Sequence, residues 1–493
     1  MTPQTEQNGT PGHTRVPGLN RETRRRLAHS GIAGSDLVML MKLDLEAVKR
    51  ARAEGHPLTI DWALPTYFDA LLTFLEKWKV LDGLSQLPDP RREPKVALLP
   101  LVLVVLCRFL IGLRSFREVE GVLFRHPEIL KRLGFTAALL EAGAYPSTGN
   151  VPCDAEVLSE VLRHFPWETI RALLVATIQR FREQHRKLFR GGRFLVDSNS
   201  FQAATRYKGA EQEQRIEAPE EKVCVLVLWT PNGLIPVDFR MAGAGEGGEG
   251  ETTCGQALLE AAHQSYGPKF IKELIWDRGY LDGPWLAEAE TRLGFRWVMG
   301  VKEGMVIYED AIGLASGPDA VWVEGEPPRF DDPRKRPKRW LCRIEELETW
   351  DGYGKPLTGL VIRDVYPDRI HLQVIVTPDP LWNTEQIHGR YRCRWSLEEL
   401  YRELTTCWQL GEKGLARRED SYRALVALML VLYAMIELFQ ATGAERMSLA
   451  ERQQAFKLGA THLIAQCDGF AAVVTMREAN ELIQREASMA RSP

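Results

Sequence analysis

The sequence predicts a mixed α/β protein in which a helical amino-terminal region precedes a sheet domain. Between about residues 35 and 190, apolar residues recur at helical spacing and short loops separate the segments. From residue 193 the pattern changes, because short β-rich runs alternate with helical stretches. The turn Pro231-Asn232-Gly233 joins two of these runs, and Asn-Gly tolerates the positive φ of a hairpin turn. These three observations predict a mixed sheet with helices on both faces.

The composition is that of a globular chain in a reducing compartment. The 493 residues suffice for two or three domains, with 45% hydrophobic and 26% charged residues. Eight cysteines without a Cys-x-x-Cys pair argue against a zinc site and fit the cytosol. The amino terminus lacks an apolar signal core. The apolar runs at 96–113 and 425–439 fall short of the roughly 20 charge-free residues of a membrane span, so we expect buried helices and a cytoplasmic protein.

The net charge of −3 hides local clusters of basic residues. Such clusters bind a polyanion even in a nearly neutral chain. They lie at residues 21–26, 180–193, 334–339 and 390–402. The tract at 334–339 is either a solvated loop or a clamp on a nucleic-acid backbone.

The amino-terminal third is expected to be helical. Residues 1–34 predict a flexible basic arm that either contacts DNA or has no task. Residues 35–190 predict a helical domain that binds DNA, with a candidate helix-turn-helix at 146–165, although that pattern is common. The expected helices cover residues 36–54, 67–78, 96–113, 116–123, 127–133, 154–164 and 166–189.

The α/β part begins at residue 191, and its first portion runs to residue 302. A strand that starts at residue 193 is expected to end in Asp197, and a second strand, which starts at residue 270, is expected to end in Asp277. The Gly-rich stretch 241–253 lacks a Gly-Lys-Ser/Thr ending, which favours a mobile loop over a phosphate-binding loop. Further strands are expected at 222–229, 234–241 and 296–301, and helices at 253–266 and after the N-cap Asp282.

A second portion follows an interruption. Residues 303–370 predict a β-rich insertion, with β-like runs at 320–323, 340–344 and 360–365. Residues 371–440 return to the α/β domain through a strand at 371–377 and helices at 383–408 and 421–440. The remaining residues, 441–493, predict a C-terminal helical segment.

The expected helix at 383–408 carries two stripes of side chains. At roughly 100° per residue, a polar stripe of five residues falls on one wall. Its members are Tyr391, Arg394, Glu398, Arg402 and Thr405. The adjoining core-facing stripe holds Leu397, Leu400, Tyr401, Leu404, Cys407 and Trp408. The polar stripe is either an ordinary solvated face with Glu and Arg four residues apart, or a wall for a metal ion and phosphates.

Three carboxylates are expected to meet at one edge of the sheet. Asp197 and Asp277 are each expected to end a strand, and Glu398 lies on the neighbouring helix. Ligands of open α/β sheets bind at the carboxyl ends of strands. Three close carboxylates repel one another unless a cation neutralises them, and hard oxygen ligands favour Mg²⁺. Two such ions about 3.5–4 Å apart stabilise the attacking and leaving oxygens of a phosphoryl displacement.

The ordered set Asp197, Trp276-Asp277-Arg278-Gly279-Tyr280 and Tyr391-x2-Arg394-x3-Glu398 resembles a known family. It is similar to the DDE transposases of bacterial insertion sequences, in the group with a Tyr-Arg-Glu-Lys signature. The resemblance covers about residues 90–440 and implies an RNase H-like fold with a β insertion before the third acid. This chain departs from the signature at Thr405, where the family has lysine. Arg402 lies one turn earlier on the same face.

The resemblance implies a reaction and a set of partners. Water attacks the phosphodiester at the element's end, and the freed 3′-hydroxyl then attacks target DNA. Asp197, Asp277 and Glu398 would hold two Mg²⁺ ions, with Mn²⁺ able to substitute. Tyr391, Arg394 and Arg402 would grip DNA phosphates. Double-stranded DNA is the implied partner, as terminal inverted repeats and as target, bound by a homodimer.

Two other functions stay open at the level of sequence. One is a domesticated DNA-binding or scaffold protein with an inactive RNase H-like fold. The intact acids count against it, and Thr405 counts for it. The other is a metal-dependent nuclease without strand transfer.

Overall fold

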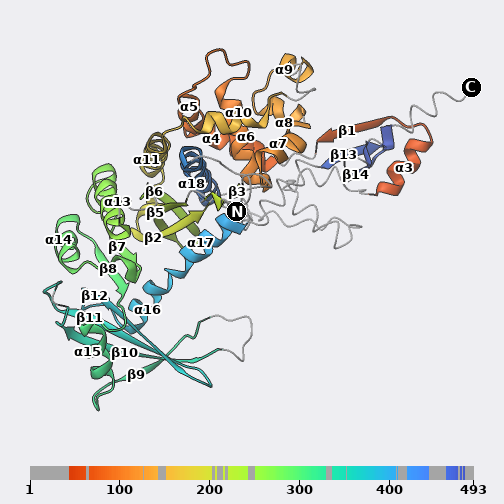
Figure 1. Ribbon diagram of the computed structural model, residues 1–493. Coiled ribbons are helices and arrows are strands. Elements are labelled where there is room, and N and C mark those ends of the chain that lie inside the picture. Colours follow the sequence, from red (N-terminus) through yellow and green to blue (C-terminus); the bar gives the residue numbers. More distant parts are fainter. Residues whose placement is uncertain are drawn as a thin grey trace, which may run out of the picture. The chain divides into compact units, whose positions relative to one another are not determined.

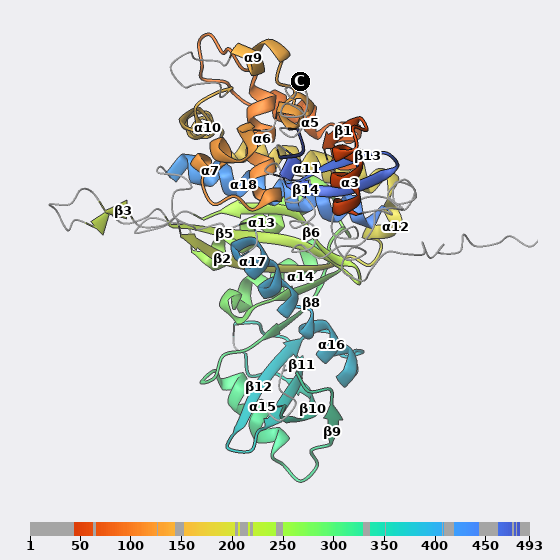
Figure 2. The same cartoon turned by 90° about the vertical axis from the view of Figure 1, so that its right-hand side faces the viewer.

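The computed structural model divides into two compact units, and each is described by itself (Figures 1 and 2). The larger unit holds residues 74–124 and 133–446, and the smaller holds 1–73, 125–132 and 447–493. The residues described are 44–62, 66–125, 127–142, 152–202, 206–207, 215–216, 220–242, 250–328, 336–350, 352–406, 408, 419–442, 462–475, 478–479 and 481–483. The expected arm at 1–34 and residues 243–249 of the expected Gly-rich loop lie outside them.

The larger unit is built on one nine-stranded mixed sheet. Its strand order is β6-β5-β2-β7-β8-β12-β11-β10-β9. The strands are β2 Arg193–Gln202, β5 Glu220–Thr230, β6 Gly233–Met241, β7 Glu273–Trp276, β8 Arg296–Gly300, β9 Trp322–Gly325, β10 Lys338–Leu347, β11 Leu357–Val365 and β12 Ile370–Thr377. A large mixed sheet with many helices is compatible with the RNase H-like fold that the resemblance implies.

Three parallel strands at the centre determine where the acids lie. Strands β2, β7 and β8 are parallel neighbours, whereas β5 and β6 form an antiparallel hairpin on β2. Helix α14 (Gly283–Leu293) returns the chain from β7 to β8, because parallel strands need such a crossover. The Asp282 carboxylate accepts a 3.1 Å bond from the Trp285 amide and caps α14, as expected. The chain therefore leaves β2 and β7 in the same direction, at one edge of the sheet.

Residues 303–370 do not form a sheet of their own, because their strands continue the central one. Strand β12 joins β8 through only two residue pairs, Ile375↔Gly300 and Val376↔Met299. Strands β11, β10 and β9 follow in antiparallel pairs. A helix that the sequence analysis did not foresee, α15 (Val306–Ala315), packs against β10, β11 and β12.

Helices cover both faces of the first half of this sheet. Figure 1 shows α13 (Glu251–Tyr266) and α14 on one side and α17 (Trp395–Thr406) and α18 (Glu419–Ala441) on the other. Helix α18 packs against β5 and β6. By length and composition α18 is apolar enough to cross a membrane, yet 83% of its apolar window is buried inside the fold. The expectation of a buried helix at 425–439 is confirmed.

Helices dominate the described residues before the sheet. In the larger unit they are α5 Val80–Ser85, α6 Leu98–Ile111, α7 Phe116–Gly121, α9 Ala137–Ala142, α10 Ala155–Leu162, α11 Trp167–Gln184 and α12 Arg186–Phe189. The expected helix at 166–189 is two helices, because His185 has the non-helical φ of −117° and ψ of 45°. Arg171 of α11 pairs with the buried Asp238 of β6 at 2.6 Å and fastens this region to the sheet. Residues 146–151 of the candidate helix-turn-helix lie outside the described part.

The smaller unit joins the two ends of the chain. Its three-stranded antiparallel sheet has the order β1-β13-β14, with β1 Leu58–Trp62, β13 His462–Cys467 and β14 Phe470–Thr475. Helix α3 (Leu45–Ala53) contributes Val48 and Ala51 to the core. Helix α8 (Pro127–Arg132) also belongs to this unit, and α4 (Thr66–Lys77) crosses the boundary between the units.

The expectation of a helical C-terminal segment at 441–493 is wrong for β13 and β14. Leu463, Ala465 and Cys467 are buried, so the apolar pattern has a strand period of two. Asp468 and Gly469 follow with φ values of 47° and 72°. Asp-Gly is a strong signal for a two-residue hairpin turn, and it explains why the segment folds as strands.

Candidate functional site

Asp197 lies within a strand rather than at its end. Strand β2 continues past it to Gln202, because residues 198–202 remain paired with β5. The expectation of a strand end at Asp197 is therefore wrong, although the neighbour β7 stops at Trp276 and leaves this part of β2 open on one side. The carboxylate accepts a 2.8 Å bond from the Ser198 amide.

Asp277 follows β7 directly and lies beside Asp197. Val196 pairs with Trp276 in the parallel register, and the residue that follows each of them in the chain is an aspartate. Neighbouring strands are about 4.8 Å apart, which brings the two carboxylates to one edge. Asp277 also precedes the 3₁₀ helix η3 (Arg278–Tyr280), and the Tyr280 amide bonds to its carbonyl at 3.1 Å. The strand register thus places Asp197 and Asp277 side by side, as expected.

The third motif is two helices, not one. Helix α16 spans Thr384–Arg392, α17 begins at Trp395, and Cys393 and Arg394 form a turn between them. The reason is local: the amides of Cys393, Arg394 and Ser396 bond to the carbonyls three residues back, as in a 3₁₀ turn. The core-facing stripe is confirmed for its described members, because Leu397, Leu400, Tyr401, Leu404 and Trp408 are buried.

Arg394 links the second and third acids. Its Nη1 lies 3.4 Å from Asp277 Oδ1, and its Nη2 donates to Glu398 Oε1 at 2.9 Å. The Arg394 side chain is only 13% exposed, against 31% for Asp277 and 45% for Glu398. One guanidinium thus holds the two carboxylates on either side of it, and its buried Nε has no hydrogen-bond partner in the described part of the protein.

The environment of Asp197 disfavours its charged form. The pKa of this carboxyl is raised to about 7, mainly by burial and next by the neighbouring Asp277 carboxylate, while the Ser198 amide and Arg394 counteract part of the effect. The hydroxyl of Tyr401, on α17, donates a 3.0 Å bond to the main-chain carbonyl of Asp197. Crowded carboxylates of this kind repel one another, and a divalent cation would relieve the repulsion.

A fourth carboxylate, Glu251, was missed by the sequence analysis. It accepts hydrogen bonds from the Ser198 hydroxyl and, at 2.8 Å, from Lys222 Nζ. Its negative charge also acts to raise the pKa of Asp197. The available signal was its place as the first residue of α13, since acids are favoured at helix N-termini.

The other predicted site residues lie around this cluster. Tyr391 is 4% exposed, and its hydroxyl accepts a 3.4 Å bond from Gln373. Arg402 is 71% exposed and lies 4.0 Å from Glu399, so the structure does not bring it to the three acids. The Thr405 hydroxyl donates to the Tyr401 carbonyl at 2.9 Å, which occupies it within its own helix.

Arg339, in the expected basic clamp, has a structural partner instead. Its guanidinium makes two 2.7 Å bonds to Asp364 on the neighbouring strand, and both side chains are largely buried. Residues 329–335 of the same stretch lie outside the described part. The guanidinium of Arg339 is therefore committed to Asp364 in this structure.

The donors at this edge fit a hard divalent cation by chemistry, since carboxylate oxygens are the ligands that Mg²⁺ prefers. In the described part of the chain, however, no three acidic, histidine or cysteine side chains converge closely enough to hold one ion. Arg394 occupies the position of a counter-ion between Asp277 and Glu398. An ion at this place would therefore require the guanidinium to move.

Comparison with known protein families matches the sheet-containing part of the chain to a described family. Residues 190–434 match the family model of the transposase DDE domain, a range that begins before β2 and ends within α18. Asp197, Asp277 and Glu398 all lie inside it. No curated protein matches the chain. The match supports a DDE transposase, a class that generally uses divalent metal ions and acts on DNA.

Proposed function

Because residues 190–434 match the transposase DDE domain, we propose that this protein is a DNA transposase of the Tyr-Arg-Glu-Lys group of bacterial insertion sequences. It cleaves DNA at the ends of an element and joins the freed 3′-hydroxyl to target DNA. The observation that carries the proposal is the strand register that places Asp197 beside Asp277, with Arg394 linking Asp277 to Glu398.

The three acids are proposed to hold two Mg²⁺ ions, or Mn²⁺ in their place. When bound, the ions would polarise the phosphodiester and stabilise charge on the attacking and leaving oxygens. The carboxylates of Asp197, Asp277 and Glu398 supply the negative charge that attracts them. The Asp197 carboxyl, with its pKa near 7, is poised to release its proton as a cation approaches.

The arginines are proposed to bind the DNA. Arg394 leaves its two acids and donates to phosphate oxygens, and its unpartnered Nε is an additional donor for them. The exposed Arg402 is free to contact a phosphate further along the strand and takes the place of the family's lysine, which is Thr405 here. Tyr391 supports Arg394, whose Cζ lies 5.9 Å from the centre of its ring.

The protein's proposed partners are DNA and a second copy of itself. The protein acts as a homodimer on two terminal inverted repeats, in the bacterial cytoplasm at the nucleoid. The helical region at 35–190 recognises the repeats, and the β-rich residues 303–370 approach the element's end. Support comes from the basic clusters of the sequence and from the family match, which covers the catalytic part.

The test is an assay with purified protein, Mg²⁺ and labelled duplexes cut from the DNA that flanks the gene. Cleavage followed by joined product is the expected result. Nicking without joined product would make the protein a nuclease, and the absence of cleavage would favour the scaffold.

Two matched variants link the reaction to the site. Asp277→Asn is expected to abolish cleavage while the duplex is still bound. Asp282→Asn, five residues away, retains a side chain that caps α14 and is expected to cleave normally. Unaltered cleavage by Asp277→Asn would remove this residue from the site.

A further inference from the structure

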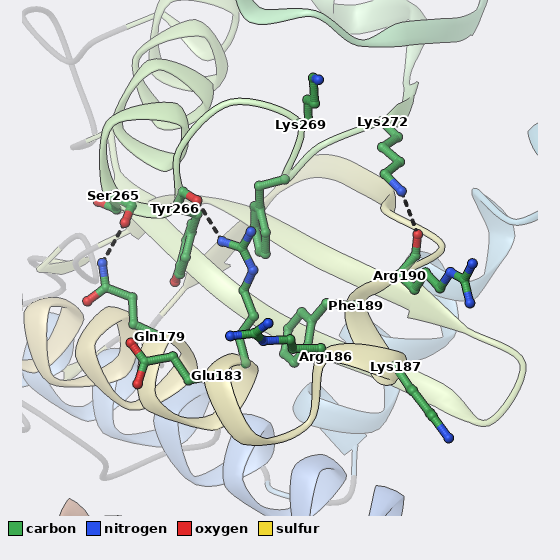
Figure 3. A pocket seen from close by; sticks show the side chains of 12 residues that line it. Gln179, Glu183, Arg186, Lys187, Phe189, Arg190, Ser265, Tyr266, Lys269 and Lys272 are labelled. Atoms are coloured by element: carbon green, nitrogen blue, oxygen red, sulfur yellow. Dashed lines mark hydrogen bonds between the residues drawn. The ribbon is translucent and has the colours of Figure 1, made fainter.

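A basic pocket lies in the larger unit, apart from the acids (Figure 3). Its volume is about 910 Å³. The end of α11, helix α12 and the segment between α13 and β7 form its walls. Part of this region is the basic cluster 180–193, and the proposed reaction uses none of it.

Six cationic side chains line the pocket, and Glu183 is the one acid among its lining residues. Two of the six are held by the fold. Arg182 Nη1 donates to the Tyr266 carbonyl at 2.6 Å, and Lys272 Nζ donates to the Arg190 carbonyl at 2.8 Å. The other four are Arg186, Lys187, Arg190 and Lys269.

These four side chains are exposed and have no ion-pair or hydrogen-bond partner within the part of the chain that the structure describes. Like charges held together destabilise a fold unless an anion accompanies them. Lys269 in addition has a φ of 67°, in the left-handed region that a lysine rarely adopts. The unfavourable backbone conformation of Lys269 and the uncompensated positive charge of the four side chains occur at the same place, which indicates a binding site.

The lining of the pocket is suited to charged groups rather than to bases. Phe189, Tyr266 and Phe270 line it, but all three are buried. Tyr266 and Phe270 stack on each other at 4.3 Å, and Phe189 stacks on Phe270 at 6.1 Å. No ring of these three is left for a base to stack on, so the ligand groups that fit are phosphates.

The pocket is remote from the bond that reacts. Lys272 precedes β7 and Asp277 follows it, so five residues of extended chain, roughly 16 Å, separate the pocket from the acids. The four free cations come from two segments rather than from one closed cradle. This spread suits a run of backbone phosphates better than a single phosphate group.

We propose that this basic pocket binds the phosphate backbone of duplex DNA at a place distinct from the scissile phosphodiester. The inference rests on the proposed function for its choice of DNA as the polyanion. Two duplexes share this chemistry, the element's own DNA beyond its cleaved end and the target DNA.

The test compares two fourfold variants of the full-length protein at the same positions. The neutral variant carries Arg186→Gln, Lys187→Gln, Arg190→Gln and Lys269→Gln. The charge-retaining variant carries Arg186→Lys, Lys187→Arg, Arg190→Lys and Lys269→Arg. Binding is measured without divalent metal, in separate titrations with an element-end duplex and an unrelated duplex, at several salt concentrations.

The neutral variant is expected to lose at least about 10-fold in affinity for one of the duplexes, and the slope of log K against log salt should flatten by about 3. The charge-retaining variant should bind as the wild type does. Loss for the element-end duplex alone assigns the pocket to the element, and loss for both duplexes, or for the unrelated one alone, assigns it to target DNA. Unchanged affinity and slope for both would overturn the inference.

A third variant covers the case in which the neutral protein fails to fold. Glu183→Gln removes the acid of the pocket and is expected to strengthen DNA binding, a change opposite in sign to any loss of fold. Failure of the proposed function would look different. If the protein binds DNA through these cations but never cleaves it, the DNA-binding role of the pocket stands and the transposase function fails. If the protein cleaves DNA and the variants bind DNA as the wild type does, the transposase function stands and the role of the pocket fails.

Discussion

The hydroxyl of Tyr401 donates a 3.0 Å hydrogen bond to the main-chain carbonyl of Asp197. This bond ties α17, which carries Glu398, to the strand that carries the first acid. The tyrosine is 6% exposed, and its ring meets that of Phe201 edge-on at 6.0 Å. Since Tyr401 is three residues after Glu398, the bond helps to position the third acid relative to the first.

Tyr401→Phe keeps the ring and removes only this hydroxyl. We expect a loss of about 1 kcal/mol in the free energy of unfolding, because a buried carbonyl loses its donor. We also expect cleavage to fall by about 10-fold or more, because small misplacements at a reacting centre cost that much. Tyr353→Phe is the matched control, since the buried Tyr353 donates to Glu290 away from the site. It should lose similar stability and no activity; equal activity in both variants would contradict the role of Tyr401.

Arg394→Gln tests the guanidinium as an internal counter-ion. Its loss leaves Asp277 and Glu398 without the cation between them, so DNA-free protein should bind Mn²⁺ about 10-fold more tightly, measured by titration calorimetry. Cleavage should fall by about 10²-fold, because a donor to the phosphate is lost. Arg402→Gln, an exposed arginine on the adjoining helix, should leave the Mn²⁺ affinity as it is. Equal Mn²⁺ affinity for both variants would count against the idea.

Gly300→Ala tests the packing of Tyr391. A Cβ at residue 300 would lie 2.5 Å from the Tyr391 hydroxyl, so the ring has to shift. We expect a loss of about 1–3 kcal/mol in unfolding experiments and weaker binding of element-end duplexes. Gly389→Ala makes the same change within α16, where nothing lies within 4 Å, and should stabilise by about 0.5–1 kcal/mol. A Gly300→Ala protein as stable as the wild type would show that Tyr391 is not held by this contact.

His388 makes the stability depend on pH. Its pKa is lowered to about 4, mainly by burial and then by the charges of Arg339 and Arg392, against the opposing effect of Asp364 and Glu326. As pH falls, His388 is therefore protonated in the unfolded chain before it is protonated in the folded protein. The free energy of unfolding is at its full value above about pH 6.5 and decreases progressively towards pH 4.

His388→Gln should remove this dependence, because a glutamine oxygen still accepts from Arg339, whose Nη1 lies 3.1 Å from the histidine Nε2. Wild type should lose on the order of 2 kcal/mol more than the variant between pH 7 and pH 4 in urea unfolding. Asp197, with its raised pKa, acts in the opposite sense and is common to both proteins. Parallel curves for the two proteins would refute the assignment to His388.

Much of the local structure follows from the sequence alone. Asp282 as an N-cap, the hairpin between β5 and β6 and the buried helix at 425–439 were each predicted from a short pattern; the turn of the hairpin lies at Pro231-Asn232, one residue before the Asn-Gly pair. The juxtaposition of Asp197 and Asp277 was predicted as well, because parallel strands align their ends.

What the sequence did not predict depends on interactions between distant segments. The break between α16 and α17 arises because the amides of Cys393 and Arg394 bond to the carbonyls three residues earlier. The sequence contains no helix-breaking residue at this place that would predict the break. Strand β12 joins β8 by two residue pairs, too few to leave a pattern in either strand. Glu251 reaches the site only through its tertiary bonds to Ser198 and Lys222.

The small three-stranded sheet has a consequence for synthesis. Leu58 of β1 pairs with Cys467 of β13, which is synthesised about 400 residues later. Nearly all residues of the larger unit are synthesised before β13. Strand β1 therefore remains an unpaired edge during almost the whole of translation. Nascent chains that stall before residue 462 should be held by chaperones at this segment, and proteins truncated there should be cleaved first near residues 58–62.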